Sequence, residues 1–161
     1  MGAQPSWISK TLLEEFEARN FHPKFRGSTQ QHLEYANLLQ QELNQGIIIE
    51  TDKIMIYNPS FLAKRPDVRY RKILDYKQIN QLTRVVHFKM DGVIELAQLL
   101  DKGDYATTLD IKDAFLHIKV SKALQPYFGF HFLTRSFTYR ALSFGYRRSP
   151  YIFTKTLAIA I

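Results

Sequence analysis

The stretch TLDIKDAFLHIKV, Thr108 to Val120, places two aspartates three residues apart between two apolar runs. Residues Tyr105 to Asp110 read as a strand, so Asp110 stands at a strand end. A carboxylate on a regular element is held firmly enough to bind a metal ion. Aspartates are also common in turns, and taken alone the stretch favours that interpretation. The rest of the sequence is needed to distinguish a metal-binding aspartate from aspartates of a turn.

The composition excludes several classes of protein. A chain of 161 residues with 45% hydrophobic residues suits one domain with a core. Because there is no cysteine, disulfides, thiolate metal sites and cysteine nucleophiles are excluded, which fits an intracellular setting. No apolar run approaches the roughly 20 residues that span a bilayer. The start, MGAQPS, fits the loose myristoylation pattern, but so short a pattern often matches by chance.

The charge favours a polyanionic partner. The net charge is +7, and nucleic acid is the first candidate for a basic chain. Tyr70 and Tyr76 are interleaved with a cluster of cations, as suits a surface that meets phosphates and bases. The cluster is Lys64, Arg65, Arg69, Arg71, Lys72 and Lys77. For Arg65, Arg69 and Lys72 a solvated run of charge is the preferred interpretation.

The helical segments follow apolar periodicity and stop signals. Residues 1–45 read as helical, broken at 21–28. The second of these helices, about 29–43, carries one apolar stripe, and Gly46 ends it. Residues 92–100 read as another helix, whereas 78–83 read as irregular or a short turn. Ser149-Pro150 opens the last helix, with serine as N-cap and proline first in the helix. The stripe consists of Leu33, Ala36, Leu39 and Leu43.

The predicted strands lie in the middle of the chain and toward its end. A β-rich region starts at 47–49. Residues 60–64 and 71–75 flank the turn Arg65-Pro66-Asp67, and 128–132 pairs with 137–142. The last helix ends in YIFTKTLAIAI, which is apolar on most faces. A helix of that kind requires burial, so we expect Leu157–Ile161 to pack against a missing part of the fold or another protein.

Four segments occur in an order that resembles a known family. They are NPSFLAKRPDVRYRKILDYKQIN (58–80), FKMDGV (88–93), TLDIKDAFLHIKV (108–120) and ALSFGYRRSPYIFTK (141–155). Together they resemble the fingers and first half of the palm of a retrotransposon reverse transcriptase. Among retrotransposons, the segments most resemble the tyrosine-recombinase (DIRS/Ngaro-like) type, which has FKM and DLKDAFLHI signatures. The resemblance runs from about Leu43 to the C-terminus.

The resemblance implies an α+β fold and a polymerase function. The expected parts are an N-terminal helical region (1–45), a fingers-like subdomain (46–100) and a partial palm with antiparallel strands (101–161). The implied reaction is RNA-directed DNA polymerisation, with Mg²⁺, deoxynucleoside triphosphates and an RNA or DNA template-primer. The compartment within the cell is left open.

The resemblance also assigns roles around Asp110. Asp110 matches the family's first metal-binding aspartate, and Ile111 would add a backbone carbonyl to a two-metal site. Asp113 and Ala114 would turn backbone N–H groups toward the triphosphate, with Asp113 a cap rather than a ligand. Phe115 matches the aromatic residue that packs under the sugar and selects deoxynucleotides; a core aromatic is the alternative.

Two further sets of residues are carried over in the same way. Lys64 and Arg71 match the cations of the fingers that clamp the nucleotide's phosphates, and Asp75 is expected to pair with a nearby cation. Phe144 and Gly145 match the template-gripping loop. Four residues depart from its pattern, and the two arginines among them either strengthen phosphate contacts or mark drift after function was lost. They are Ser143, Tyr146, Arg147 and Arg148.

The family's second set of carboxylates is absent from this sequence. No two aspartates are adjacent, and the one adjacent acidic pair is Glu14-Glu15. One carboxylate cannot hold two Mg²⁺ ions against water. We therefore expect a chain that does not polymerise by itself. The alternatives are a non-catalytic nucleic-acid-binding module and a structural component of a larger assembly. His117 and His131 are expected to be strand-face residues rather than ligands.

Overall fold

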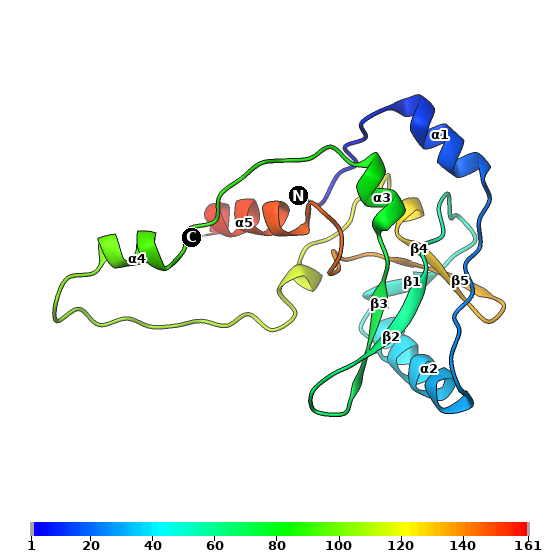
Figure 1. Ribbon diagram of the computed structural model, residues 1–161, viewed down its shortest axis with the longest axis horizontal. Helices are drawn as coiled ribbons and strands as arrows, with labels where there is room; N and C mark the ends of the chain where they lie inside the picture. Colours follow the sequence, from blue (N-terminus) through cyan, green and yellow to red (C-terminus); the bar gives the residue numbers. More distant parts are fainter. Residues whose placement is uncertain (1, 161) are drawn as a thin grey trace.

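The computed structural model describes residues 2–160, with side chains to Ile159. Its helices and antiparallel strands confirm the α+β class (Figure 1). The helices are α1 (Lys10–Ala18), α2 (Thr29–Asn44), α3 (Lys77–Leu82), α4 (Val93–Leu99) and α5 (Ser149–Ala160), with 3₁₀ turns η1 (Ala114–His117) and η2 (Gln125–Tyr127). The strands are β1 (Ile48–Glu50), β2 (Ser60–Lys64), β3 (Tyr70–Leu74), β4 (Gly129–Phe132) and β5 (Arg135–Tyr139).

The strands form two antiparallel sheets. One has the order β1-β5-β4, and the other is the β2-β3 hairpin. The predicted pairing of 128–132 with 137–142 is confirmed, but β5 begins earlier because Phe132 already opposes Arg135. Leu133, with φ of +55°, supplies the left-handed residue of this tight turn. The division at residues 45 and 100 stays a prediction.

The core is largely aromatic. Phe128, Phe130 and Phe137 are fully buried in and beside the three-stranded sheet, and Tyr35 of α2 stacks on Phe132 with ring centroids 4.2 Å apart. The predicted stripe on α2 is therefore partly wrong. Leu33 is 64% exposed, because the buried face is centred on Tyr35 and Leu39. The predicted stripe counted aliphatic residues only. It therefore omitted Tyr35, which can be buried because its hydroxyl forms a hydrogen bond with the Ser60 hydroxyl.

Three other local predictions are also wrong. Residues 77–82 form helix α3, since Ile79 and Leu82 are fully buried one helical turn apart. Ser149 is not the N-cap of α5. Its hydroxyl donates to the Ser143 carbonyl, and the first helical bond, from Ile152 N, is accepted by Arg148 O. Asp75 forms no ion pair within residues 2–160; it accepts a hydrogen bond from the Lys77 amide instead.

The predicted strand at 105–110 is also wrong. Figure 1 shows α4 carried on a long extended arm, and the segment returning from it reaches η1 without joining a sheet. Tyr105 is fully exposed and Leu109 is 90% exposed. Because neither sheet of residues 2–160 reaches this segment, its backbone has no strand to pair with. A β-forming sequence becomes a strand only beside a partner.

Within residues 2–160, no helix is long and apolar enough to cross a bilayer.

Candidate functional site

Asp110 lies at the end of the arm, four residues before η1 begins at Ala114, and is exposed. Within residues 2–160 no three acidic or histidine side chains gather closely enough to hold a metal ion. The donors that the sequence analysis assigned are one carboxylate and the Ile111 carbonyl. Since Mg²⁺ takes six oxygen ligands in near-octahedral geometry, this set does not fit a pair of Mg²⁺ ions by itself.

Asp113 adopts a left-handed conformation, with φ of 51° and ψ of 43°. Aspartate tolerates this conformation better than most residues do. Asp113 occupies the N-cap position of η1, as predicted, but its side chain makes no capping bond. Its carbonyl accepts from Leu116 N, and in the described part of the chain the amides of Asp113 and Ala114 form no hydrogen bond. Two backbone donors are thus free beside Asp110.

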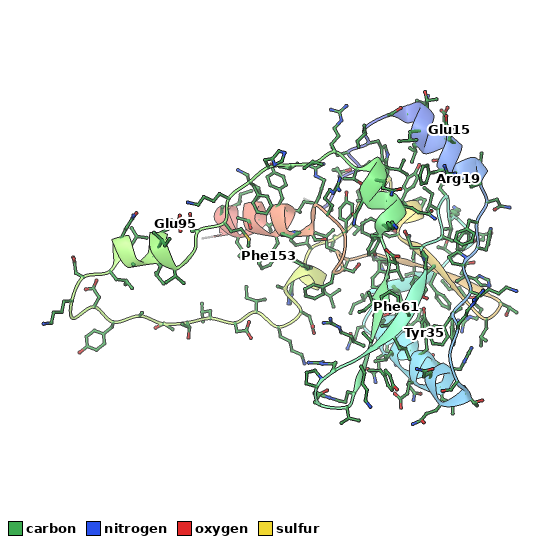
Figure 2. The ribbon with its side chains drawn as sticks, in the orientation of Figure 1. Glu15, Arg19, Tyr35, Phe61, Glu95 and Phe153 are labelled. Atoms are coloured by element: carbon green, nitrogen blue, oxygen red, sulfur yellow. The ribbon has the colours of Figure 1, made fainter. Side chains whose placement is uncertain are left out.

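Phe115 links the predicted nucleotide residues to the predicted template loop. Its ring centroid lies 4.9 Å from that of Phe144 and 5.6 Å from that of Phe153 on α5. Figure 2 shows Phe153 on the side of α5 that faces η1. Sequence analysis missed Phe153, although its place in an otherwise apolar helix marks it as a packing residue. The three rings hold η1, the loop and α5 together.

Asn80 of α3 fixes the shape of the 143–148 loop. Its side-chain Nδ2 donates to the Gly145 carbonyl at 2.8 Å, and its Oδ1 accepts from the Arg147 amide at 2.7 Å. Gly145 has φ of +95°, a conformation that favours glycine. Asn80 was not singled out in the sequence, because only the tertiary fold brings residues 80 and 145 together.

The departures from the family pattern have structural roles. The Ser143 hydroxyl lies 2.6 Å from the Tyr76 hydroxyl in the core. Tyr146 is buried, and its ring packs on Phe128 at 4.9 Å. Arg148 lies over the ring of Tyr151, at 5.7 Å. Ser143 and Tyr146 therefore attach the loop to the core through Tyr76 and Phe128.

A cavity of about 640 Å³ lies between the β2-β3 hairpin, α3 and this loop. Phe61 of β2, which is labelled in Figure 2, borders the cavity and is 45% exposed. The lining combines apolar side chains, a loop glycine and cations. Its polar and loop members are Asp75, Lys77, Asn80, Gln81, Gly145 and Arg147. Of the four predicted template residues, the structure places Gly145 and Arg147 in this wall.

Lys64 and Arg71 are both exposed on the hairpin. Lys64 opposes Tyr70 and Arg71 opposes Ala63. Because directly opposed residues share a face and successive residues alternate, Lys64 and Arg71 leave opposite faces. Lys64 lines a second cavity, on the α2 side of the hairpin. The structure does not bring the two cations together.

Lys72 is not part of a solvated run of charge, and that prediction is wrong. Only 1% of its side chain is exposed, and Nζ lies 2.8 Å from Glu42 Oε2 and 2.6 Å from the Tyr139 hydroxyl. Burial lowers the pKa of Lys72, and Glu42 opposes that shift. Arg69, in contrast, forms an exposed pair with Asp67. Successive side chains of β3 point to opposite faces of the hairpin, so Lys72 points inward on the same face as Leu74.

Residues 62–161 match the family model described as reverse transcriptase (RNA-dependent DNA polymerase). The chain belongs to this family. Among curated relatives of this reverse-transcriptase chain, the Pol polyprotein of transposon 297 of Drosophila melanogaster is 26% identical over 129 residues, 78% of the chain and 12% of the relative. The Gag-Pro-Pol polyprotein of Human T-cell leukemia virus 3 (strain Pyl43) is 32% identical over 108 residues, 63% of the chain and 8% of the relative. The chain thus spans about a tenth of the length of these relatives.

Solved reverse-transcriptase structures share the fold. The foamy viral protease-reverse transcriptase in complex with double-stranded DNA aligns over 99% of this chain and 32% of its own, with a TM-score of 0.75 and 19% identity. The same enzyme in complex with an RNA/DNA hybrid aligns over 87% of this chain and 19% of its own, with a TM-score of 0.72 and 19% identity. The likeness places this reverse-transcriptase chain in the fingers and palm region of the fold.

Proposed function

We propose that this chain forms the template-facing and nucleotide-facing part of an RNA-directed DNA polymerase, and that it does not polymerise alone. The observation that carries the proposal is the junction around Phe115. Asn80 clamps the Gly145–Arg147 backbone to α3, and Phe144 of the same loop packs on Phe115. Residues assigned to the nucleotide and residues assigned to the template therefore meet in one place.

At this junction each group has a defined task. The free amides of Asp113 and Ala114 bind phosphate oxygens, and Phe115 packs beneath the sugar of a deoxynucleoside triphosphate. Lys64 and Arg71 contribute positive charge from the two faces of the hairpin. Reverse transcriptases use a divalent metal; Asp110 and Ile111 would supply two of the oxygen ligands for it. Those two donors do not fit a metal pair unaided, so the remaining carboxylates must come from elsewhere.

The single-stranded template lies along the 640 Å³ cavity. Phe61 and Phe144 offer exposed rings for stacking with bases, being 45% and 62% exposed. Arg147 contacts phosphates from the wall of the cavity, whereas Arg148 is outside its lining and lies over the ring of Tyr151. The +7 charge strengthens binding of any polyanion.

We also propose the finer relationship to the tyrosine-recombinase type of retrotransposon. The FKM of Phe88–Met90 and the DIKDAFLHI of Asp110–Ile118 support it. Phe88 packs against Tyr151 of α5, at 5.5 Å, so FKM anchors the arm that leads to Asp110. A tyrosine-recombinase reading frame beside the parent gene would support this assignment, and a retroviral-type integrase there would contradict it. An intracellular location and the division at residues 45 and 100 belong to the same proposal.

Primer extension tests the catalytic half of the proposal. The 161-residue chain is incubated with Mg²⁺, deoxynucleoside triphosphates and a primed RNA template. We expect no extension, because the sequence has no adjacent aspartates. Extension that depends on Mg²⁺ and disappears in Asp110→Asn would show that the chain is a polymerase by itself.

Oligonucleotide binding tests the other half. We expect Asn80→Ala to weaken binding of a single-stranded RNA several-fold, because the loop loses both of its bonds to α3. Asn37→Ala, on the exposed side of α2, serves as the matched control. If the unmodified chain binds no oligonucleotide at low salt, the template-facing role is wrong.

A non-catalytic nucleic-acid-binding module is the second candidate. The cavity of about 640 Å³ favours it, together with the lack of any cluster of three acidic or histidine side chains within residues 2–160. Binding without any change in the presence of Mg²⁺ and nucleotide would support it. A structural component of a larger assembly is the third, in which a partner covers the end of α5. Ile159 is 84% exposed there, and the side chains of residues 160 and 161 lie outside the described residues. Co-purification of the chain with the rest of the palm, and loss of that association in Ile159→Glu, would support this role.

A further inference from the structure

A second, smaller cavity lies far from the junction around Phe115. It measures about 120 Å³ and is lined by Lys24, Phe25, His32, His131, Phe132 and Leu133. We call it the histidine-lined cavity. Figure 1 shows the segment between α1 and α2 running past the β4-β5 turn, on the side of the molecule away from α4 and α5. The cavity belongs to none of the sites described above.

Three separate parts of the chain build this cavity. Lys24 comes from the segment between α1 and α2, His32 from the first turn of α2, and His131 from β4. Phe25 holds them together, because its ring packs on His32 at 4.9 Å and on Phe132 at 5.9 Å. Half of the lining residues can carry positive charge, and none is acidic.

The polar atoms of this cavity are available to a ligand. His32 Nδ1 lies 2.9 Å from the Ser28 carbonyl, which can only accept, so Nδ1 carries the hydrogen and Nε2 faces no protein partner within residues 2–160. His131 uses Nδ1 toward the Ser136 hydroxyl, at 3.4 Å, and its Nε2 is likewise without a partner in the described chain. Lys24 forms no ion pair in that same part of the structure.

The size of the cavity defines the kind of ligand. Sites for whole small molecules measure about 300–1,000 Å³, so a cavity of about 120 Å³ admits one group of a larger ligand. Positive charge without carboxylates selects an oxyanion. The flanking chain adds Arg26 and an aromatic surface, where His22 stacks on Tyr57 with ring centroids 4.1 Å apart and Phe21 is 54% exposed. Cations interleaved with exposed rings are typical of contacts to single-stranded nucleic acid.

We propose that the histidine-lined cavity binds a backbone phosphate of a single-stranded nucleic acid, giving the chain a second contact to the strand outside the polymerase site. Lys24 provides the charge. With the Ser136 hydroxyl donating to His131 Nδ1, the hydrogen of that ring is on Nε2, which donates to a phosphate oxygen, and His32 lines the wall beside it. The aromatic surface of His22 and Tyr57 takes an adjacent base. This contact does not depend on the function of the junction around Phe115.

A salt titration of binding tests the contact. A fluorescent single-stranded oligoribonucleotide is titrated with the full chain, with Lys24→Gln and with the control Lys122→Gln, which removes an exposed lysine elsewhere. Loss of one phosphate contact lowers the slope of log affinity against log salt by about 0.7. We therefore expect Lys24→Gln to bind roughly eightfold more weakly at about 50 mM salt and about fourfold more weakly at about 150 mM. The control should stay within about twofold of the unmodified chain, with its slope unchanged.

Two outcomes of this titration would overturn the proposal: an unchanged slope in Lys24→Gln, or an equal effect in Lys122→Gln. Lys24 is exposed, so its substitution leaves the core intact, and His131→Gln gives an independent variant with the same expected direction. Adding Asn80→Ala separates the two sites. If the contacts are independent, the effects of Lys24→Gln and Asn80→Ala multiply; if only the Asn80→Ala effect is seen, the histidine-lined cavity binds nothing.

Nuclear magnetic resonance locates the ligand. The imidazole resonances of His32 and His131 are followed during titration with the oligoribonucleotide and, separately, with inorganic phosphate. We expect the oligonucleotide to shift both rings at concentrations that saturate the anisotropy signal. Shifts with inorganic phosphate but not with the oligonucleotide would assign the cavity to free phosphate and contradict the nucleic-acid contact. The absence of both shifts would contradict any oxyanion site.

Discussion

The ammonium group of Lys72 lies 2.8 Å from a carboxylate oxygen of Glu42, and the pair joins β3 to α2 beneath the hairpin of the fingers. The Tyr139 hydroxyl bonds to both residues, at 2.6 and 3.0 Å, and Nζ lies 4.0 Å from the centroid of the Phe130 ring. One buried charge pair thus ties together the hairpin, the long helix and the three-stranded sheet.

Removing one member of this pair should destabilise the chain strongly. Glu42→Leu leaves the Lys72 ammonium buried without its countercharge, and such changes cost about 3–5 kcal/mol. The double variant Glu42→Leu/Lys72→Met should recover most of that loss, because no unpaired charge remains. Urea denaturation measures both. The exposed pair of Asp67 and Arg69 is the control, and Asp67→Asn should leave the midpoint nearly unchanged. Equal losses in the single and double variants would show that packing, rather than charge, explains the effect.

The chain should lose stability in alkali. Burial raises the pKa of five tyrosines: Tyr35, Tyr76, Tyr127, Tyr139 and Tyr146. Since an unfolded tyrosine ionises near pH 10, the folded chain holds protons there that the unfolded chain releases. Stability is therefore full below about pH 10 and falls as the pH rises above it.

Denaturation midpoints measured from neutral to strongly alkaline pH test whether stability falls above about pH 10. The absorbance of tyrosinate reports which tyrosines have ionised. We expect some of the nine tyrosines to ionise only when the chain unfolds. Tyr146→Phe removes one buried hydroxyl and keeps its ring in the core, so it should make the alkaline loss shallower. A midpoint that is constant above pH 10 would contradict the prediction.

Gly145 is expected to matter more for binding than for stability. Gly145→Ala imposes a φ of +95° on a residue with a side chain, which costs about 1–2 kcal/mol. Its new Cβ would also lie 3.4 Å from the Leu74 carbonyl oxygen and from Tyr76. Gly103→Ala is the matched control, because Gly103 has φ of +104° and nothing within 4 Å of an added Cβ. We expect similar losses of stability, measured by thermal unfolding, and weaker RNA binding in Gly145→Ala alone. Equal binding losses would remove the loop from the template site.

Val68 at the tip of the hairpin offers a stabilising substitution. It has φ of +68°, which is strained for a β-branched side chain, and it is 68% exposed, so little burial would be lost. Val68→Gly should raise the free energy of unfolding by about 1 kcal/mol. Val85→Gly, at an exposed site without a positive φ, should lower it or leave it unchanged. Destabilisation in Val68→Gly would indicate that the valine side chain makes a compensating contact.

The sequence by itself determined the α+β class, the long helix α2, the β2-β3 hairpin and the β4-β5 pairing. These features depend on local signals, namely apolar periodicity, a glycine that ends the helix and turn residues between β-forming runs. It also determined the family, because the order of four short segments requires no knowledge of contacts. The absence of adjacent aspartates was equally a property of sequence.

Only the tertiary structure decided which polar residues are buried and which segments meet. Residues 105–110 have the composition of a strand, but they remain an exposed arm because no strand lies beside them in the described chain. Lys72 reads as one cation among many, yet it is buried because alternation turns it toward Glu42 and Tyr139. Asn80 and Gly145 are 65 residues apart in the sequence, and the fold joins them through a hydrogen bond of 2.8 Å. Local preferences set the elements, whereas burial and long-range pairing set the site, because both depend on neighbours that are distant in the chain.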